Sequence, residues 1–216
     1  MYKFLSLKDH VYQYIAEQIS KGELVPGKKI NENEICQELS ISRTPVREAL
    51  IQLSSEGVLE NVPRKGFIIK ELKEDEARQL YEVIGLLDGL AARLACPHLS
   101  EKHLKDMAFY IDSMDLAIES DNYEMYYKQQ VIFHELYTEE CGNQVLINIL
   151  SQLKNKFVSK TYDLSTDSEG KRILHTTNQE HRIILDLFRK KDSEGLMQYL
   201  QKTHWNPDLA HTEKTI

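Results

Sequence analysis

The segment 42–50, which reads SRTPVREAL, constrains the fold of this chain most strongly. Val46, Leu50 and Leu53 recur at helical spacing, so they define one helix face that must be buried. Pro45 suits the first turn of a helix, where backbone N–H groups lack intrahelical partners. The segment therefore predicts a helix that begins near residue 43 and packs one apolar face against a core.

Two arginines lie on a neighbouring face of the same predicted helix. Arg43 and Arg47 are four residues apart near its N-terminus, and Ser42 or Thr44 can cap it. Such a helix end suits the DNA major groove, where guanidinium groups bond guanine or phosphate. An ordinary surface helix with two basic residues carries the same pattern, so the flanking segments must decide between the two.

Two further helical segments precede this one. Apolar residues four apart, from Leu7 to Ile19, predict a first helix that ends near Gly22. Asn31 can cap a short second helix. Only residues 40–41 separate this second helix from the arginine-bearing one, which is the arrangement of a helix-turn-helix.

A basic hairpin is expected directly after these helices. Residues 57–62 and 67–70 are β-branched runs on either side of a turn that contains proline and glycine. They predict the wing of a winged helix. Arg64 and Lys65 at its tip can grip the DNA backbone or enter a minor groove, and Gly66 permits close approach.

From residue 26 to residue 69 the chain resembles the winged-helix domain of GntR-type bacterial transcription regulators, close to their FadR-like branch. The motif 42–50, the residues Leu53 and Gly57 after it and the basic hairpin carry the resemblance. Asn33 departs from it, because related sequences usually have an Arg there. The resemblance implies operator contacts by Arg43, Thr44, Arg47 and Gly66, to which the pattern adds Ser42, Arg64 and Lys65.

Composition limits the class of protein. The 216 residues, 41% of them hydrophobic, suffice for one large or two ordinary domains. No apolar run approaches the ~20 residues of a membrane span and no signal-peptide pattern opens the chain, so we expect a cytoplasmic protein without a membrane partner. The three cysteines lack CxxC spacing and indicate neither a disulfide framework nor a zinc ribbon. Basic and acidic residues balance up to residue 72, so the net charge of −7 belongs to the remainder.

Beyond residue 73 the pattern predicts helices alone. The expected fold class is mainly α, with an N-terminal winged helix-turn-helix domain (1–72) and an all-α antiparallel bundle of about six helices (73–216). The helices are expected over 74–95, 100–119, 122–141, 143–161, 169–190 and 192–205. The expected core stripes are Leu80, Leu87, Leu90 and Leu94 in the first of them and Val145, Ile149, Leu153 and Phe157 in the fourth.

Three histidines in different predicted helices are candidate metal ligands. His134, His181 and His204 could hold Zn²⁺ or a similar ion at the centre of the bundle. Lone helical histidines are also common as packed or solvent-facing residues, so the residues alone leave both readings open.

The sequences around His134 and His181 also resemble the effector-binding domain called FCD, which follows the FadR-like winged helix. Many members hold a metal, Zn or Ni among the candidates, through one Asp and three His, and the metal helps to bind a small carboxylate effector. The position of that Asp is Gln130 here, and an amide oxygen is a poorer ligand than a carboxylate. Counting from Asp192 puts Thr203 where the third His is expected, with His204 one residue late.

A metal-free pocket for a less polar effector is the rival interpretation. Ile84 replaces an Arg that commonly meets the effector carboxylate. Tyr126, Tyr127 and Arg172 are candidate pocket residues, each equally compatible with a core or surface position. A helical part that only dimerises and senses nothing is a third alternative.

We expect a bacterial transcription regulator that binds a pseudo-palindromic operator as a two-fold homodimer. A small-molecule effector would shift the helical domain between states that differ in operator affinity. An enzyme, with His134 and His181 in a metal hydrolase centre, is the remote alternative. Neither His-Glu-x-x-His spacing nor a nucleophile elbow is present, and the winged helix would be left unexplained.

Overall fold

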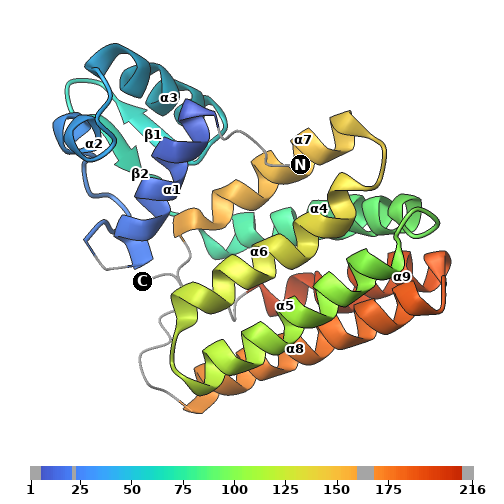
Figure 1. The fold of residues 1–216 in the computed structure, drawn as a ribbon. Coiled ribbons are helices and arrows are strands. Elements are labelled where there is room, and N and C mark those ends of the chain that lie inside the picture. Colours follow the sequence, from blue (N-terminus) through green and yellow to red (C-terminus); the bar gives the residue numbers. More distant parts are fainter. Residues whose placement is uncertain (1–5, 21–22, 160–167, 211–216) are drawn as a thin grey trace. The chain divides into compact units, whose positions relative to one another are not determined.

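The computed structural model describes residues 6–20, 23–159 and 168–210 (Figure 1). The chain folds into two compact units, and the first boundary between them falls between Lys73 and Glu74. Residues 154–159 also belong to the first unit.

The first unit contains three helices and a two-stranded sheet. The helices are α1 (Leu7–Ser20), α2 (Glu32–Glu38) and α3 (Arg43–Ser55), and the strands are β1 (Leu59–Val62) and β2 (Gly66–Ile69). Asn31 caps α2 as expected, since its side chain accepts a hydrogen bond from the backbone N–H of Asn33. Gly22, the expected end of the first helix, lies outside the described residues.

The two strands form an antiparallel hairpin in which Leu59 pairs with Ile69 and Val62 with Gly66. Ile30 adds a hydrogen bond from its N–H to the Phe67 carbonyl, so the chain before α2 lines the outer edge of β2. The buried residues between the sheet and the helices are apolar. Those that are fully buried are Val11, Ile15, Ile35, Val46, Leu50, Leu53 and Ile69. The winged helix-turn-helix expected from the sequence is confirmed.

The second unit is built from helices. They are α4 (Glu74–Ala95), α5 (Glu101–Glu119), α6 (Tyr123–Glu139), α7 (Gln144–Asn155), α8 (Ser168–Arg189) and α9 (Ser193–Tyr199). A π-helix over Leu200–His204 continues α9, and a short 3₁₀ turn follows over Pro207–Leu209. The 3₁₀ turn after α7, Lys156–Ser159, lies in the segment that belongs to the first unit. Ser100, Asn122 and Asp192 cap α5, α6 and α9, which explains why the helices begin where the sequence predicts. The all-helical character of this part is confirmed; residues 160–161 of the expected fourth helix lie outside the described residues.

The expected core stripes of this unit are wrong in detail. In α4 only Leu80 of the predicted leucines is buried, while Leu87, Leu90 and Leu94 are half-buried. In α7, Val145 and Ile149 are 68% and 41% exposed, and the buried residues are their neighbours Leu146 and Leu150. The physical reason is that small residues, Ala77, Gly85, Gly89, Ala91, Ala92 and Ala95, form much of the enclosed face of α4, and a stripe drawn through large side chains misses them.

Two glycines of α4 let the end of the chain pack closely against this helix. A Cβ at Gly89 would lie 2.9 Å from the carbonyl oxygen of Met197, and one at Gly85 would lie 3.1 Å from Cβ of Trp205. The absence of side chains there brings the π-helix against the middle of α4.

No helix among the described residues is long and apolar enough to cross a membrane.

Candidate functional site

The structure presents the basic residues of α3 on the outer face of this helix. Val46 and Leu50 are fully buried, whereas Arg43, Thr44 and Arg47 are exposed. Ser42 occupies the N-cap position with an extended backbone, but its side chain makes no capping hydrogen bond. The exposed polar surface expected from the sequence is therefore available at the N-terminal end of α3.

Helix α2 contacts both arginines, a feature that the sequence did not predict. The side-chain oxygen of Asn33 accepts a hydrogen bond of 2.8 Å from Nη2 of Arg43. Glu32 lies 4.0 Å from the guanidinium of Arg47. Asn33 thus restrains a neighbouring Arg. The polar residue Asn33 in the first turn of the preceding helix is the sequence feature from which this contact could have been predicted.

The hairpin tip is basic and solvent-exposed. Arg64 and Lys65 are exposed, and the backbone N–H of Lys65 donates to the Val62 carbonyl at 3.0 Å. Arg64 and Gly66 have φ values of 66° and 89°, in the left-handed region that glycine adopts without strain. The turn thereby directs two cations outward from the end of the sheet.

In the helical unit, His134 of α6, His181 of α8 and His204 of the π-helix form a buried cluster. One ligand nitrogen from each lies within 4.8 Å of the other two. Nε2 of His134 and Nε2 of His204 are 3.1 Å apart. For comparison, the edge of a zinc tetrahedron with Zn–N bonds near 2.0–2.1 Å is roughly 3.3 Å. The structure thus brings together all three histidines that the sequence singled out.

The π-helix corrects the expectation that Thr203 occupies the third histidine position. The N–H of Trp205 donates to the carbonyl of Leu200, five residues back, at 2.9 Å, whereas an α-helix bonds four residues back. This wider turn accommodates one extra residue. His204 is therefore buried in the cluster and Thr203 is only half-buried, and the one-residue offset disappears.

A hydrogen-bond chain determines which nitrogen of His134 carries the hydrogen. The Tyr137 hydroxyl donates to Oδ2 of Asp88 at 2.8 Å and lies 2.7 Å from Nδ1 of His134. Burial, the Asp88 charge and the hydrogen bond to it raise the pKa of Tyr137 well above its usual value, so the phenol keeps its single hydrogen. Its oxygen consequently accepts from Nδ1–H of His134, so in the neutral imidazole Nε2 is the nitrogen without a hydrogen.

The other two imidazoles are oriented in the same way. Nδ1 of His204 lies 2.8 Å from a Glu180 carboxylate oxygen, which can only accept. Nδ1 of His181 lies 3.3 Å from Oδ1 of Asn178, whose amide nitrogen donates to the Ile111 carbonyl and to Asp115. Each Nδ1 therefore donates outward, and in the neutral imidazole each Nε2 faces the cluster without a hydrogen.

Converging lone pairs are the donor set of a cation site. A shared proton would satisfy one pair of nitrogens, whereas a metal ion serves all three. Nε2 of His181 is buried and has no hydrogen-bond partner among the described residues, and the same is true of Oε1 of Gln130, one turn before His134. Burial, and then the neighbouring His204 and His134, lower the pKa of His181 well below its usual value, so this imidazole is a neutral ligand at pH 7. The residues present fit a Zn²⁺ or Ni²⁺ ion.

Asp88 is the residue of this site that the sequence analysis missed. It is fully buried and accepts hydrogen bonds from Tyr137 and from Nε1 of Trp205, the latter at 2.8 Å. Its position four residues after Ile84, on a helix face otherwise made of apolar and small residues, was a usable signal. A charged residue on a buried helix face needs partners and marks a polar site.

The expected effector-pocket residues do not all gather at the cluster. Ile84 is fully buried in α4, and Tyr127 is half-buried, with its ring 5.5 Å from that of Tyr126. Arg172 is exposed. It lies nine residues before His181, which is half a turn out of phase, so α8 presents it on the opposite side from the cluster.

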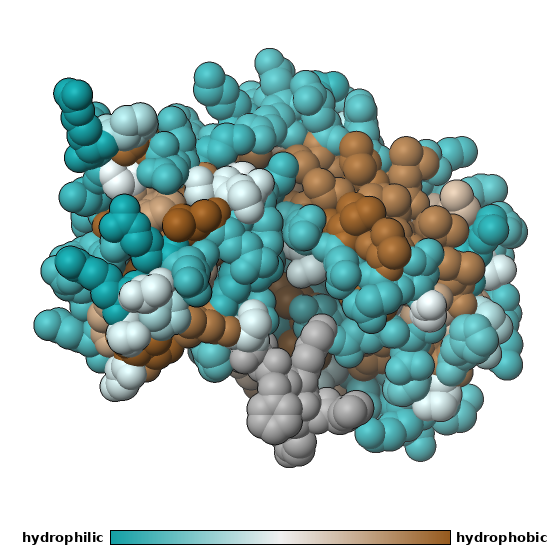
Figure 2. All heavy atoms as spheres, turned by 90° about the horizontal axis from the view of Figure 1, so that it is seen from above, coloured by the Kyte–Doolittle hydropathy of each residue, from teal (hydrophilic) through white to brown (hydrophobic). Residues whose placement is uncertain are grey.

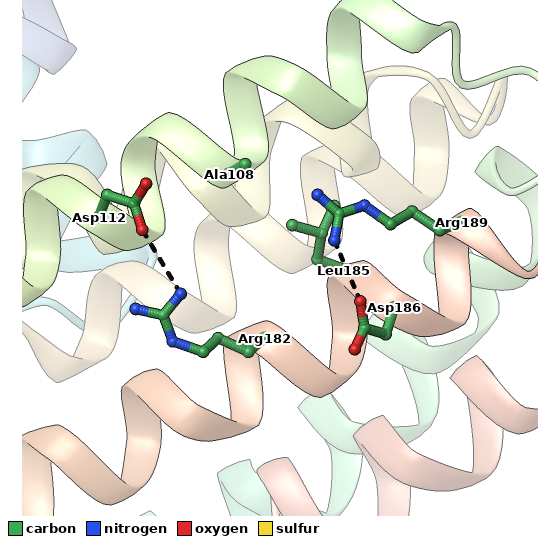
Figure 3. A pocket seen from close by; sticks show the side chains of 6 residues that line it. All are labelled: Ala108, Asp112, Arg182, Leu185, Asp186 and Arg189. Atoms are coloured by element: carbon green, nitrogen blue, oxygen red, sulfur yellow. Dashed lines mark hydrogen bonds and ion pairs between the residues drawn. The ribbon is translucent and has the colours of Figure 1, made fainter.

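A separate groove of about 310 Å³ lies between α5 and α8 (Figure 3). Arg182 bridges to Asp112 at 3.4 Å, and Arg189 pairs with Asp186 at 3.1 Å. Because its arginines are already neutralised by aspartates, the groove offers little attraction to an anionic effector.

Comparison with known proteins agrees with this architecture. The family model described as bacterial regulatory proteins, gntR family, matches residues 7–69, and the FCD domain model matches residues 79–203. The Nta operon transcriptional regulator of Aminobacter aminovorans is 30% identical over 189 residues, which are 88% of this chain and 83% of that protein. The uncharacterized HTH-type transcriptional regulator YdhC of Bacillus subtilis is 27% identical over 95% of this chain and 90% of its own length.

Among solved structures, Escherichia coli McbR/YncC superposes with a TM-score of 0.82 and covers 97% of this chain and 98% of its own. At 22% identity this likeness shows the fold alone.

The fold and the outward-facing basic helix define a winged-helix DNA-binding protein with a helical sensor domain. The chain belongs to the GntR family of bacterial transcription regulators and carries an FCD effector-binding domain. The relatives named above are regulators of transcription, and this chain is a transcription regulator of the same family.

Proposed function

We propose that this regulator binds a pseudo-palindromic operator as a homodimer through α3 and the hairpin tip. Arg43, Thr44 and Arg47 would enter the major groove, and Ser42, Arg64, Lys65 and Gly66 would contact the backbone or the minor groove. The observation that carries this proposal is the exposure of Arg43, Thr44 and Arg47 on a helix whose opposite face is buried, together with the exposed cations of the hairpin tip. A regulator with this partner acts in the cytoplasm, where the bacterial chromosome lies.

Gel-shift assays with genomic fragments in a salt series test the operator proposal. We expect sequence-selective binding whose affinity falls steeply with salt, because phosphate contacts release counterions. Equal binding to all fragments would contradict it.

We further propose that His134, His181 and His204 bind a divalent metal, Zn²⁺ or Ni²⁺, with Gln130 as a weak fourth donor. The convergence of three lone pairs, one on an otherwise unsatisfied buried nitrogen, carries this proposal. The metal would act as a Lewis acid that attracts an oxygen of a small-molecule effector. The three histidines would orient the ion, and Glu180, Asn178 and Tyr137 would orient the histidines.

Elemental analysis of protein purified without a polyhistidine tag tests the metal proposal. We expect about one metal ion per chain after incubation with Zn²⁺ and dialysis. Protein that stays metal-free would instead favour a metal-free pocket or a helical unit that only dimerises.

For the homodimer, the exposed apolar side chains of α4 and α7 supply a candidate interface. Val83 and Leu86 of α4 are 45% and 47% exposed, and Val145 and Ile149 of α7 are exposed as well. The face of the helical unit seen in Figure 2 has a broad apolar area. An area of this kind commonly marks a protein–protein contact. Light scattering of wild type and of Leu86→Glu measures the oligomeric state. We expect a dimeric wild type and a monomeric variant.

We propose a regulatory and non-enzymatic role for the helical unit. An effector bound beside the metal would favour one conformation of this unit and thereby change operator affinity. Titration of the protein–operator complex with candidate small carboxylates, with and without Zn²⁺, measures this coupling.

A further inference from the structure

The proposed donor set brings no negative charge to the metal. An imidazole that binds a metal through Nε2 and keeps its hydrogen on Nδ1 carries no charge, nor does the amide of Gln130, and the cluster is buried. A divalent cation in such surroundings is costly unless carboxylates lie near it. Asp88 and Glu180 each contact one of these imidazoles.

Asp88 is the more deeply enclosed of the two. Its side chain is 0% exposed, against 14% for Glu180. Oδ2 of Asp88 lies 3.4 Å from Nδ1 of His134 and accepts hydrogen bonds from Tyr137 and Trp205. It therefore faces the side of the imidazole opposite to Nε2, which excludes it as a direct ligand in this arrangement.

We propose that Asp88 is a positioning residue that supplies the buried counter-charge for the metal through His134 and Tyr137. This inference rests on the metal site proposed above and adds a residue of α4 to it. The carboxylate strengthens His134 as a donor, because it stabilises positive charge that the metal draws onto the ring. It also connects α4, α6 and the segment after the π-helix at a single oxygen atom.

The hydrogen bond between Trp205 and Asp88 makes tryptophan fluorescence a probe of metal binding. Trp205 is the only tryptophan of the chain, and its ring centroid lies 5.9 Å from that of His134 and 5.6 Å from that of His204. Its indole N–H bonds to Asp88. Metal binding should therefore change its fluorescence, a signal independent of DNA binding.

The test measures the Zn²⁺ dissociation constant by competition with a chromophoric chelator, for full-length wild type and matched variants. Asp88→Asn removes the charge but keeps an oxygen acceptor for Tyr137 and Trp205, and we expect it to weaken Zn²⁺ binding about 10- to 100-fold. Trp205→Phe removes one hydrogen bond and keeps the charge, so it should weaken binding far less. In the double variant Asp88→Asn/Gln130→Asp, a carboxylate at a ligand position should recover about tenfold or more of the loss.

Each result is decisive. If wild type binds no Zn²⁺, the metal site itself fails. If wild type binds and Asp88→Asn binds equally well, or if Trp205→Phe matches its loss, the role of Asp88 is overturned. A loss that Gln130→Asp does not recover also overturns it, because the effect would then be structural.

Tyr137→Phe serves if Asp88→Asn does not fold. It removes the hydroxyl that hydrogen-bonds both Asp88 and His134 and leaves only the 3.4 Å contact between them, so Zn²⁺ binding should weaken about tenfold. Unchanged binding there would overturn the proposal, and the quenching or shift of Trp205 fluorescence on Zn²⁺ addition provides the second readout.

Discussion

Arg43 and Arg47 extend into solvent from α3, whereas His134, His181 and Asp88 are enclosed within the helical unit. The arginines are stable in water without partners, and the contact that each makes with α2 is weak. The histidines and Asp88 need every hydrogen bond that they make, because unsatisfied polar groups are costly in a low-dielectric interior. Substitutions should therefore act independently on the DNA-reading face and cooperatively in the histidine cluster.

The largest effect is expected in the cluster. His181→Ala removes a ligand with no replacement nearby, so Zn²⁺ affinity should fall by more than the ~10- to 100-fold typical of outer-shell changes. His175→Ala on the same helix α8 is the matched control, since its side chain is 40% exposed and pairs with Glu119. Isothermal titration of both variants checks the contrast, and equal affinities would remove the distinction between the two histidines.

The next largest effect is expected on the DNA-reading face. Arg43→Ala and Arg47→Ala should each cost about 1–3 kcal/mol of operator affinity, and the two costs should be nearly additive because the side chains are exposed. Arg78→Ala, an exposed arginine of α4 that pairs with Asp208, is the control. Gel-shift titrations of the single and double variants would contradict this prediction if wild-type operator selectivity survived in the double variant.

A moderate effect on stability is expected from adding a side chain where α4 packs closely against α9. Gly89→Ala places a Cβ 2.9 Å from the Met197 carbonyl oxygen, so it should lower the free energy of unfolding by about 1–3 kcal/mol, as overpacking does. Glu82→Ala on the exposed side of α4 is the comparison variant. Urea denaturation measures both, and equal stability of the two would show that the backbone yields at this point.

The smallest effect is expected from the restraint on Arg43. Asn33→Ala removes an exposed hydrogen bond whose net worth is about 0.5–1.5 kcal/mol, so operator affinity should fall about 2- to 10-fold. Gln37→Ala, another exposed neutral residue of α2, should leave affinity unchanged. Fluorescence anisotropy with a labelled operator distinguishes them, and tighter binding by Asn33→Ala would show that the contact holds Arg43 away from DNA.

The sequence predicted the helices well because their signals are local. Caps such as Asn31, Ser100 and Asp192 lie at helix starts, and apolar spacing of three and four residues marks the segments between them. The buried faces of α4 and α7 were predicted less well. Periodicity identifies a stripe of large side chains, but tight packing at Gly85 and Gly89 decides which side of α4 is enclosed.

The histidine cluster shows the same division between local and non-local information. The sequence by itself determined which residue types carry the chemistry, namely the arginines of α3 and the three histidines. Only the tertiary structure decided that a π-helix brings His204 rather than Thr203 into the cluster, and that Asp88 and Asn33 contact these residues. The reason is physical: a helical pattern repeats within a few residues, whereas the contact between Asp88 and His134 joins positions far apart in the chain and exists only after the helices have packed.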